Sequence, residues 1–593
     1  MSLTLYYFHK ITLIIVLNNK TRRKYRKRGI LRVFMKKLLS TLFLTCCMFA
    51  AFAQNSLPFT KGVNMLTYFE TWSKGDLPNL NKHDEEDFAC LKSMGIEVIR
   101  LPVHFDLLME PYDTGTIYDF VLEKLDQVCD WAEKYQIYLV IDDHSFNTEE
   151  YDHNPPSAKI YQEHLESVWS QIAYRYKDRS QYIIYEILNE PKSHGEIATK
   201  WIKIQQNIIN LIRTYDPTRD IVVTGADFSN IDGLVKMKPY KDSNLIYTFH
   251  FYEPHIFTHQ GATWVGKEMM DLEDLPFPYD RNRLPKLKGN AKNSWVQDAI
   301  QNSYSTEGTV KYIDNRIKKA ADWGKKNNVR VWCGEIGAKT WINSTDRLAW
   351  INATREALNA NNIPYCIWGL DGSDGLLTSA DPGFHFPEDI DKDALEAYGF
   401  TMPEQKLAEK ISLNISAEKP YLVYDGLQGK GVGKNIWGNV KEITKDSTRD
   451  YCMSVSYPGQ QNGCKFILPQ KITELIAENP ESFAISFTVK FTDSKQEFPL
   501  NLSDTDEGAA LPPWNNTAQI KASEYQTGEW VTVEIPFSKL TETGAWSEKA
   551  NQFFEPQGKY DWNRLRYIYF DFDNFHRKNT RDISIDDIVI KKK

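Results

Sequence analysis

Short apolar runs alternate with longer amphipathic segments from residue 59 to about residue 412. The runs show no clean alternation of polar and apolar positions, which is typical of strands covered on both faces in a parallel sheet. Strand and helix repeats of this kind indicate parallel βαβ units. We predict strands at 59–66, 96–103, 137–144, 182–188, 220–226, 244–251, 329–335 and 364–370, and helices at 84–94, 118–134, 157–176, 198–215, 310–326, 345–360 and 403–412, with a further short helix before the sixth strand.

One connection of this domain, from residue 252 to about residue 306, is too long for an ordinary loop. It contains the polar and aromatic segment HIFTHQGATW. Long ordered loops in compact domains commonly build binding sites. We therefore predict that this segment is an insertion that forms part of a site.

After about residue 416 the pattern changes to short strand-like runs without long helices. The runs are YLVYDG, YCMSVSYPG, SFAISFTVKFT, EWVTVEIPFSKL, RLRYIYFDFDNF and DISIDDIVIKKK. Several short strands in succession indicate an all-β sandwich. The sequence thus predicts two domains, an α/β domain at 54–415 and a β-sandwich at 416–593.

The first residues of the chain carry a different signal. Residues 35–53 have a basic start, a short apolar run and Ala51-Phe52-Ala53 before Gln54, which is the pattern of a cleaved secretory signal peptide. Residues 1–34 precede it and are interpreted as a non-native extension from a start codon assigned too early. Because no other run approaches the roughly 20 apolar residues that span a bilayer, we predict a protein without a membrane span that is secreted, periplasmic or attached to the cell surface.

Net charge and aromatic content indicate which classes of molecule the protein can bind. A net charge of -8 and an isoelectric point near 5.9 argue against nucleic acid as a partner. The chain is 13% aromatic and holds 16 Trp, more than a core requires. Sugar rings stack on aromatic faces, so the excess suits a carbohydrate-binding protein, although core packing is the alternative use of the same residues.

The cysteines are spread too thinly to form a disulfide framework. Cys333 and Cys366 fall in predicted strands and are expected to be buried thiols. Cys452 and Cys464 lie close together in the predicted sandwich, and for this pair a bridge and two free thiols are both open.

Two predicted strands end in a glutamate. The run QYIIYEILNEP stops at Glu190, and Pro191 is expected to end the strand there and to hold Glu190 extended at its carboxyl edge. The run VRVWCGE repeats the design and ends at Glu335. In parallel α/β folds this edge is where sites are built. Glycosidic bond cleavage needs one carboxyl group held neutral and one held ionised, and such a pair supplies both.

These motifs and their order resemble glycoside hydrolase family 5 over roughly residues 58–413. The motifs are IRLPV with Arg100, IDDH with His144, ILNEP with Asn189 and Glu190, FHFYEP with His250 and Tyr252, CGEIG with Glu335, and IWGLDG with Trp368. The resemblance implies a (β/α)8 TIM barrel, with these motifs at the ends of its second, third, fourth, sixth, seventh and eighth strands.

The resemblance also implies roles for the two glutamates. Glu190 would be the acid/base and Glu335 the nucleophile of a retaining double displacement. Because Glu335 must stay ionised, a cation is expected beside it. Arg100 is the candidate, with a structural ion pair to Glu186 as the alternative.

The remaining motif residues would bind substrate. Asn189 would contact the sugar 2-hydroxyl, Tyr252 would orient Glu335, and His144 and His250 would bind hydroxyls, with a core position as the alternative for each histidine. Trp368 would floor the subsite of the reacting sugar. Candidates for outer subsites are Trp72, Trp264 and Trp341.

We expect no metal and no cofactor. His250, His255 and His259 invite a metal interpretation, but the first strand lacks a His-x-His motif and no His-Glu-x-x-His helix occurs. A Gly-x-Ser-x-Gly elbow and a phosphate loop are likewise not found in the sequence.

The C-terminal domain resembles jelly-roll carbohydrate-binding modules of galactose-binding-like shape, on GEWVTVEIPFSKL and the closing DISIDDIVI. Candidate sugar platforms are Trp437, Trp514, Trp546, Tyr560 and Trp562, with core packing as the alternative for each. Asp586 and Asp587 are candidates for a structural calcium site, with surface charge as the alternative.

We therefore predict a secreted, monomeric, retaining endo-β-1,4-glucanase (cellulase) that acts on β-glucan. Within enzymes, the alternative is a β-mannanase or a mixed-linkage or xyloglucan-directed glucanase. The alternative of another class is a surface glycan-binding protein that has the barrel without turnover. The intact Glu190, Glu335 and Asn189 argue against that last hypothesis.

Overall fold

The structure is a computed structural model that describes residues 56–593 except 148–150, 152, 378–385, 388, 409–414, 417–418, 447, 457–460, 505–512, 548–549 and 573–581. The predicted extension at 1–34 and signal peptide at 35–53 lie outside the described residues. Among the helices that are described, none has the length and hydropathy that crossing a membrane requires.

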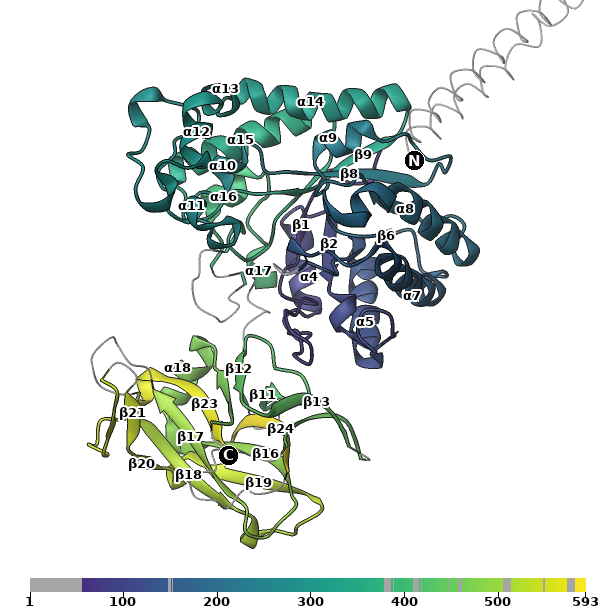
Figure 1. Cartoon of the computed structure of the whole chain (residues 1–593). Helices are drawn as coiled ribbons and strands as arrows, with labels where there is room; N and C mark the ends of the chain where they lie inside the picture. The colour runs from purple at the N-terminus through teal and green to yellow at the C-terminus, as the bar shows by residue number, and fades with distance from the viewer. Residues whose placement is uncertain are drawn as a thin grey trace, which may run out of the picture. The chain divides into compact units, whose positions relative to one another are not determined.

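The first part of the chain folds as a closed parallel barrel in the order β1-β10-β9-β8-β7-β6-β5-β2 (Figure 1). Its strands are β1 (Lys61–Asn64), β2 (Val98–Val103), β5 (Tyr138–Asp143), β6 (Ile183–Glu186), β7 (Ile221–Thr224), β8 (Leu245–Phe251), β9 (Arg330–Ile336) and β10 (Tyr365–Ile367). Parallel pairing of β1 with β10 closes the barrel. The predicted (β/α)8 fold is confirmed.

Helices connect successive strands around the barrel. They are α4 (Glu85–Ser93), α5 (Asp119–Tyr135), α7 (Ala158–Tyr176), α8 (Gly195–Tyr215), α9 (Ile231–Lys236), α14 (Val310–Asn327), α15 (Ser344–Ala360), α16 (Lys392–Ala397) and α17 (Gln405–Ala408). Several start where a side chain caps the first turn, such as Asp84, which forms a capping box with Asp87, and Ser157, which accepts from the backbone of Ile160. Helix α16 and the small hairpin of β3 (Met109–Glu110) and β4 (Thr116–Ile117) were not predicted.

The backbone at Glu190 differs from the prediction. Strand β6 already ends at Glu186, and Glu190 has a φ of 41°, so it is not held in an extended conformation before Pro191. The segment after β6 still pairs with the end of β5, because the backbone N–H of Asn189 donates to the backbone carbonyl of Asp143 at 2.9 Å. A left-handed φ on a residue other than glycine is strained and is often retained at functional sites. This turn places the Glu190 carboxylate against His250.

The segment predicted as an insertion is a folded region of short helices. It contains α10 (His255–Thr258), α11 (Lys267–Met270), α12 (Trp295–Asn302) and α13 (Tyr304–Glu307), joined by 3-10 turns. Ile256, Phe257, Met269 and Leu272 from this region join the core cluster of the barrel. The insertion is therefore packed onto the barrel rather than standing free as a loop.

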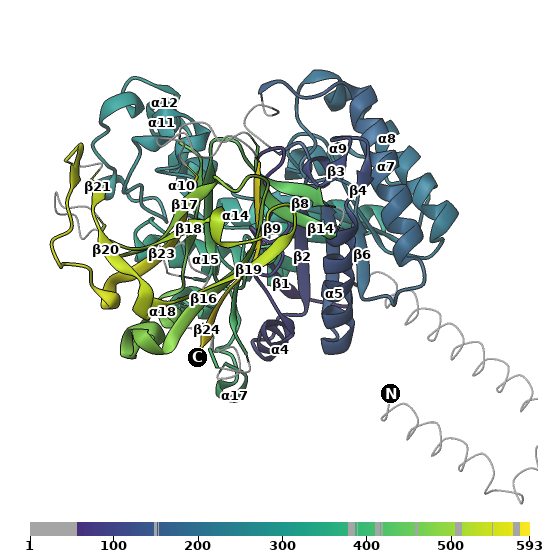
Figure 2. The same cartoon turned by 90° about the horizontal axis from the view of Figure 1, so that it is seen from below.

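The C-terminal part is a sandwich of two antiparallel sheets, coloured green to yellow in Figures 1 and 2. The first sheet has the order β13-β14-β24-β16-β19, with β11 also paired to β24, and the second has the order β12-β15-β23-β17-β18-β20. Aromatic residues of both sheets, including Phe487 on the first and Phe498 and Phe570 on the second, meet in one core. The all-β prediction is confirmed.

The bounds of the sandwich strands show which runs were predicted. The first sheet consists of β11 (Tyr421–Tyr424), β13 (Val440–Asp446), β14 (Arg449–Val455), β16 (Phe483–Phe491), β19 (Trp530–Pro536) and β24 (Ile583–Lys592). The second consists of β12 (Gly433–Trp437), β15 (Gly463–Ile467), β17 (Glu497–Asp504), β18 (Asn515–Lys521), β20 (Thr541–Thr543) and β23 (Leu565–Asp571). A hairpin of β21 (Ala545–Ser547) and β22 (Gln552–Phe554) and one helix, α18 (Gln470–Glu478), complete it.

The structure decides between a Cys452–Cys464 disulfide and two free thiols, which the sequence left open. Cys452 lies on β14 and Cys464 on β15, which belong to different sheets, and both are buried free thiols. Cys333 and Cys366 are also buried free thiols, as predicted. Asp586 and Asp587, considered for calcium, both form ion pairs with Arg449, at 2.7 and 2.6 Å.

Candidate active site

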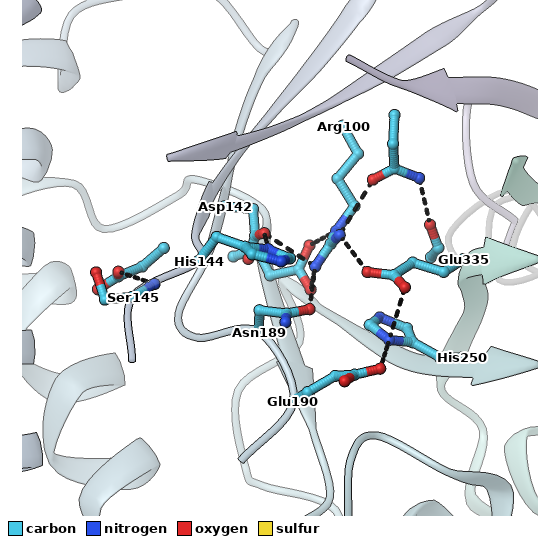
Figure 3. Close-up of polar contacts among 12 residues, drawn as sticks. Arg100, Asp142, His144, Ser145, Asn189, Glu190, His250 and Glu335 are labelled. Atoms are coloured by element: carbon cyan, nitrogen blue, oxygen red, sulfur yellow. Dashed lines mark hydrogen bonds and ion pairs between the residues drawn. The ribbon is translucent and has the colours of Figure 1, made fainter. Parts of the chain in front are cut away.

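Polar side chains gather where the barrel strands end (Figure 3). Arg100 lies on β2, His144 directly follows β5, Asn189 and Glu190 follow β6, His250 lies on β8, and Glu335 lies on β9. Strand pairing explains this gathering, because β8 and β9 are neighbours in register with His250 opposite Glu335. Most of these side chains are buried, whereas the Glu190 side chain is 22% exposed.

Arg100 is the centre of the network and is fully buried. Its Nη1 donates to Glu335 Oε1 at 2.7 Å, while Nε and Nη2 donate to the two carboxylate oxygens of Glu186 at 2.8 and 3.0 Å. Nη2 also lies 3.0 Å from Asp142 Oδ2. Both predictions for Arg100 therefore describe contacts that it makes. The same guanidinium is the cation beside Glu335 and the ion-pair partner of Glu186.

Two asparagines complete the shell around Arg100. Nη1 donates to Asn64 Oδ1 at 3.1 Å, and Nη2 donates to Asn189 Oδ1 at 2.9 Å. The Asn64 amide in turn donates to the backbone carbonyls of Gly334 and Ile367 at 3.1 and 3.0 Å. This contact turns the oxygen of Asn189 toward Arg100 and leaves its amide nitrogen to donate to a ligand.

Each carboxylate oxygen of Glu335 accepts a hydrogen bond. Tyr252 Oη donates to Oε2 at 2.7 Å, opposite the contact of Arg100 with Oε1. Burial raises the pKa of Glu335 above its usual value, against the opposing effect of the Arg100 cation. The two donors favour the ionised form. Such a fixed carboxylate is suited to nucleophilic attack on an electrophilic carbon.

His250 lies between the two glutamates. Its Nδ1 is 2.6 Å from Glu190 Oε1 and 3.4 Å from Glu335 Oε2. Burial lowers the pKa of His250 to about 4, so the ring is neutral near pH 7. With Nδ1 facing carboxylate oxygens, the single ring proton belongs on Nδ1 and is donated to Glu190. A carboxylate oxygen of Glu190 and one of Glu335 lie within 4.8 Å of each other.

His144 and Trp368 form an aromatic layer beside these carboxylates. His144 Nδ1 lies 2.6 Å from Asp142 Oδ2, and burial lowers the pKa of His144 well below its usual value. The imidazole stacks on Trp368 with ring centroids 5.5 Å apart. Trp368 itself is half-buried, so one part of its ring is open to a ligand.

Two of the three tryptophans proposed for outer subsites, Trp264 and Trp341, lie together. Trp264, on the insertion, and Trp341, in the loop after β9, are 53% and 50% exposed, and their ring centroids are 6.2 Å apart. Trp341 Nε1 donates to the Gln260 carbonyl at 2.7 Å. Trp72 is 57% exposed and makes an edge contact with His104. His255 and His259 stack on each other, with ring centroids 4.1 Å apart.

Several residues of the network were missed from the sequence. Asn64 and Asp142 contact Arg100 directly, and Glu70 and His104 join the predicted His144 in a second polar cluster next to it. Asn64 and Asp142 stand at the carboxyl ends of β1 and β5, and that position was the available signal. Glu70 and His104 lie in irregular segments after β1 and β2, where no periodic pattern marks them.

Comparison with known proteins shows which family this chain belongs to. The model of the family described as Cellulase (glycosyl hydrolase family 5) matches residues 58–374. Endoglucanase 3 of Fibrobacter succinogenes is 32% identical over 338 residues, which are 54% of this chain and 50% of that protein. Endoglucanase C of Acetivibrio thermocellus is 25% identical over 291 residues, 47% of this chain and 81% of that protein.

A solved structure titled endoglucanase Cel5A from the hyperthermophilic Thermotoga maritima is 24% identical, with a TM-score of 0.47, over 59% of this chain and 99% of its own. The chain spans about half the length of the Fibrobacter relative. The family model covers more than half of the chain, and the residues it covers include both glutamates and the whole Arg100 network. The chain therefore belongs to the cellulase family, glycosyl hydrolase family 5.

Proposed function

We propose that the protein is a retaining endo-β-1,4-glucanase that hydrolyses β-glucan. The observation that carries the proposal is the pairing of Glu190 and Glu335 on either side of His250, with Arg100 and Tyr252 fixing Glu335. The names of the relatives, Endoglucanase 3 and Endoglucanase C, support glucan as the substrate class. The proposal includes export, because residues 35–53 have the pattern of a signal peptide.

The spacing of the two glutamates supports retention. Retaining enzymes hold their carboxyl groups about 5 to 5.5 Å apart, whereas inverting enzymes leave roughly 6.5 to 9.5 Å for a water molecule. A carboxylate oxygen of Glu190 and one of Glu335 lie within 4.8 Å of each other, and this short spacing supports retention rather than inversion.

In the proposed reaction Glu335 attacks the anomeric carbon while Glu190 donates its proton to the departing glycosidic oxygen. The bond between the anomeric carbon and that oxygen breaks as the ester to Glu335 forms. Glu190, now ionised, takes a proton from water, and the resulting nucleophile displaces Glu335 from the sugar. The N–H of His250 stabilises the ionised form of Glu190 between the two steps.

Substrate contacts follow from the same positions. Asn189 is proposed to donate to the sugar 2-hydroxyl from its amide nitrogen, and Trp368 with His144 to support the ring of the reacting sugar. Trp264 and Trp341 offer exposed aromatic faces for sugars farther along the chain.

Hydrolysis by residues 54–593 on a panel of polysaccharides tests the proposal. Reducing sugar should be released from carboxymethylcellulose and mixed-linkage β-glucan, and NMR of the first product should show the β-anomer, as retention requires. Preference for mannan or xyloglucan would assign the protein to the alternative specificity. A first product in the α-configuration would contradict retention. Binding without release from any member would favour the glycan-binding hypothesis.

We further propose that the sandwich binds glycan through the hairpin of β21 and β22. Trp546 and Phe553 face each other across this hairpin and are 52% and 55% exposed. The other candidates are engaged elsewhere: Trp514 is buried, Trp437 contacts Tyr569, and Trp562 stacks on Phe537.

Replacing Trp546 with alanine should weaken binding to insoluble cellulose without changing hydrolysis of soluble glucan. Loss of one stacking platform is worth about 1 kcal/mol, or roughly fivefold in affinity. A pull-down with cellulose measures the bound fraction, and Tyr174→Ala, an equally exposed aromatic on α7, is the matched control. Equal binding by the Trp546 variant, the control and the unchanged protein would remove the hairpin as the binding surface.

A further inference from the structure

A second buried cluster, made of Glu70, His104 and His144, lies beside the catalytic network. Its members come from the carboxyl ends of three neighbouring strands, because Glu70 follows β1, His104 directly follows β2 and His144 directly follows β5. All three are more than nine-tenths buried. Each offers one ligand atom, and these atoms all lie within 4.8 Å of one another.

Hydrogen bonds fix the ring tautomer of both histidines. His104 Nδ1 lies 2.5 Å from the Thr71 carbonyl, and a carbonyl only accepts, so Nδ1 carries the proton. His144 Nδ1 lies 2.6 Å from Asp142 Oδ2, a carboxylate that also accepts from Arg100 at 3.0 Å. Each ring therefore presents an unprotonated Nε2 to the cluster. Among the described residues, His104 Nε2 is buried without a hydrogen-bond partner.

Glu70 brings negative charge to the same space. Its Oε2 accepts from the Thr67 amide at 2.5 Å, whereas Oε1 lies 3.9 Å from His104 Nε2, too far for a hydrogen bond. One potential ligand atom from each of the three residues thus lies in the same small buried space.

We propose that Glu70, His104 and His144 bind a divalent transition metal, with Zn²⁺ as the best match. Two neutral imidazoles and one carboxylate are a recurring zinc ligand set, and they leave the fourth position open. The Thr71 carbonyl and Asp142 hold the ligand rings as outer partners do in metal sites. Ligand distances of about 2.0 to 2.2 Å require the three atoms to close to roughly 3.5 Å, a movement of about an ångström.

Zinc at this position excludes substrate, a consequence that rests on the proposed function. His144 stacks on Trp368, and the exposed Trp72 makes an edge contact with His104, so the cluster adjoins the aromatic faces offered to sugar. The same three lone pairs would accept hydrogen bonds from sugar hydroxyls. Zinc and glucan therefore compete for one set of acceptors, and zinc acts as a competitive inhibitor.

Metal binding is tested on EDTA-treated residues 54–593 by competition with a chromophoric zinc chelator. We expect one Zn²⁺ per chain, with affinity reduced at least about tenfold in Glu70→Gln and in His104→Gln. Co²⁺ should give the intense visible absorption of a four-coordinate site, which a purely structural role for these residues would not produce. Circular dichroism of both variants checks that they are folded.

Glu335→Gln is the matched control, because Glu190, His250 and Glu335 form the other group of potential ligands. It should keep the zinc affinity of the unchanged protein. Loss of binding in Glu335→Gln with full binding in Glu70→Gln would move the metal to the catalytic glutamates and overturn the proposal. No binding to the unchanged protein would also overturn it.

Inhibition is measured separately. Added Zn²⁺ should raise KM for soluble glucan with kcat unchanged, and Glu70→Gln should lose this effect. A fall in kcat at constant KM would contradict competition with substrate. If no glucan is hydrolysed, the chelator and Co²⁺ measurements still decide whether the metal site exists, so failure of the proposed function and failure of the metal site remain distinguishable.

Discussion

Glu335→Gln is expected to lower kcat on soluble β-glucan by roughly 10⁴- to 10⁶-fold, the range seen when a covalent nucleophile is removed. Glutamine keeps the shape of the side chain, and its single amide oxygen can accept from Arg100 or from Tyr252, which donate to different oxygens of Glu335. It cannot form the glycosyl ester. Reducing-sugar release and a thermal melt of the same preparation separate lost chemistry from lost folding.

Glu190→Gln provides the comparison that assigns the two roles. Its kcat on glucan should fall by about 10²- to 10⁴-fold, because a general acid contributes in that range. On an aryl glycoside, whose leaving group needs no proton, most of that loss should disappear, whereas Glu335→Gln should stay inactive. Full activity of Glu335→Gln on both substrates would overturn the catalytic assignment.

Arg100→Met is expected to produce the largest loss of stability, about 3 to 5 kcal/mol in the free energy of unfolding. The guanidinium is fully buried and contacts the carboxylates of Asp142, Glu186 and Glu335. Methionine fills much of the volume but leaves three carboxyl groups together without a cation. Urea denaturation measures the loss. Arg100→Lys restores the charge with fewer hydrogen bonds, so its stability should lie between that of Arg100→Met and that of the unchanged protein.

The loss in Arg100→Met should also depend on pH. Burial already raises the folded-state pKa values of Asp142 and Glu335 above their usual values, and without the cation these two values rise further. A raised folded pKa gives stability that is complete below the unfolded pKa and is lost as pH rises through the folded pKa. The difference between Arg100→Met and the unchanged protein should therefore be small near pH 4 and grow toward pH 7. A difference that is the same at both pH values would show that charge is not its cause.

The barrel was predictable because its elements carry strong local signals. Burial on both faces makes the strands largely apolar, as in β7, whose four residues IVVT are all buried. Helix starts lay within a few residues of their predicted positions because capping side chains mark them, as Ser157 does for α7. Glu190 and Glu335 could be found because each directly follows or ends such a run.

The polar contacts were harder to predict, because they depend on how strands pair across the barrel. Nothing local to His250 indicates that it lies opposite Glu335 on the neighbouring strand and reaches back to Glu190. The conformation of Glu190 was predicted wrongly, because the restriction that proline places on the preceding residue was the only local signal and the tertiary contact to His250 overrode it.

The sandwich was predicted only in outline. Strands with strong apolar faces, such as β16, were found, whereas β18 has the sequence NNTAQIK and buries only Ile520. Such a strand is set by its ladder to β17 rather than by its own side chains. Trp546 was predicted as a candidate sugar platform, but its pairing with Phe553 was not, since the two residues face each other only through the β21–β22 hairpin.

The order of strands along the chain also sets when each core can form during synthesis. The barrel closes when β10 pairs with β1, and both strands precede the sandwich. In the first sheet of the sandwich, β24 pairs with β11, β14 and β16, so all of these wait for residues 583–592. Domains generally fold as units from the N-terminal side. The barrel can therefore fold while the rest of the chain is still being synthesised. The first sheet of the sandwich cannot be completed until β24 has been synthesised.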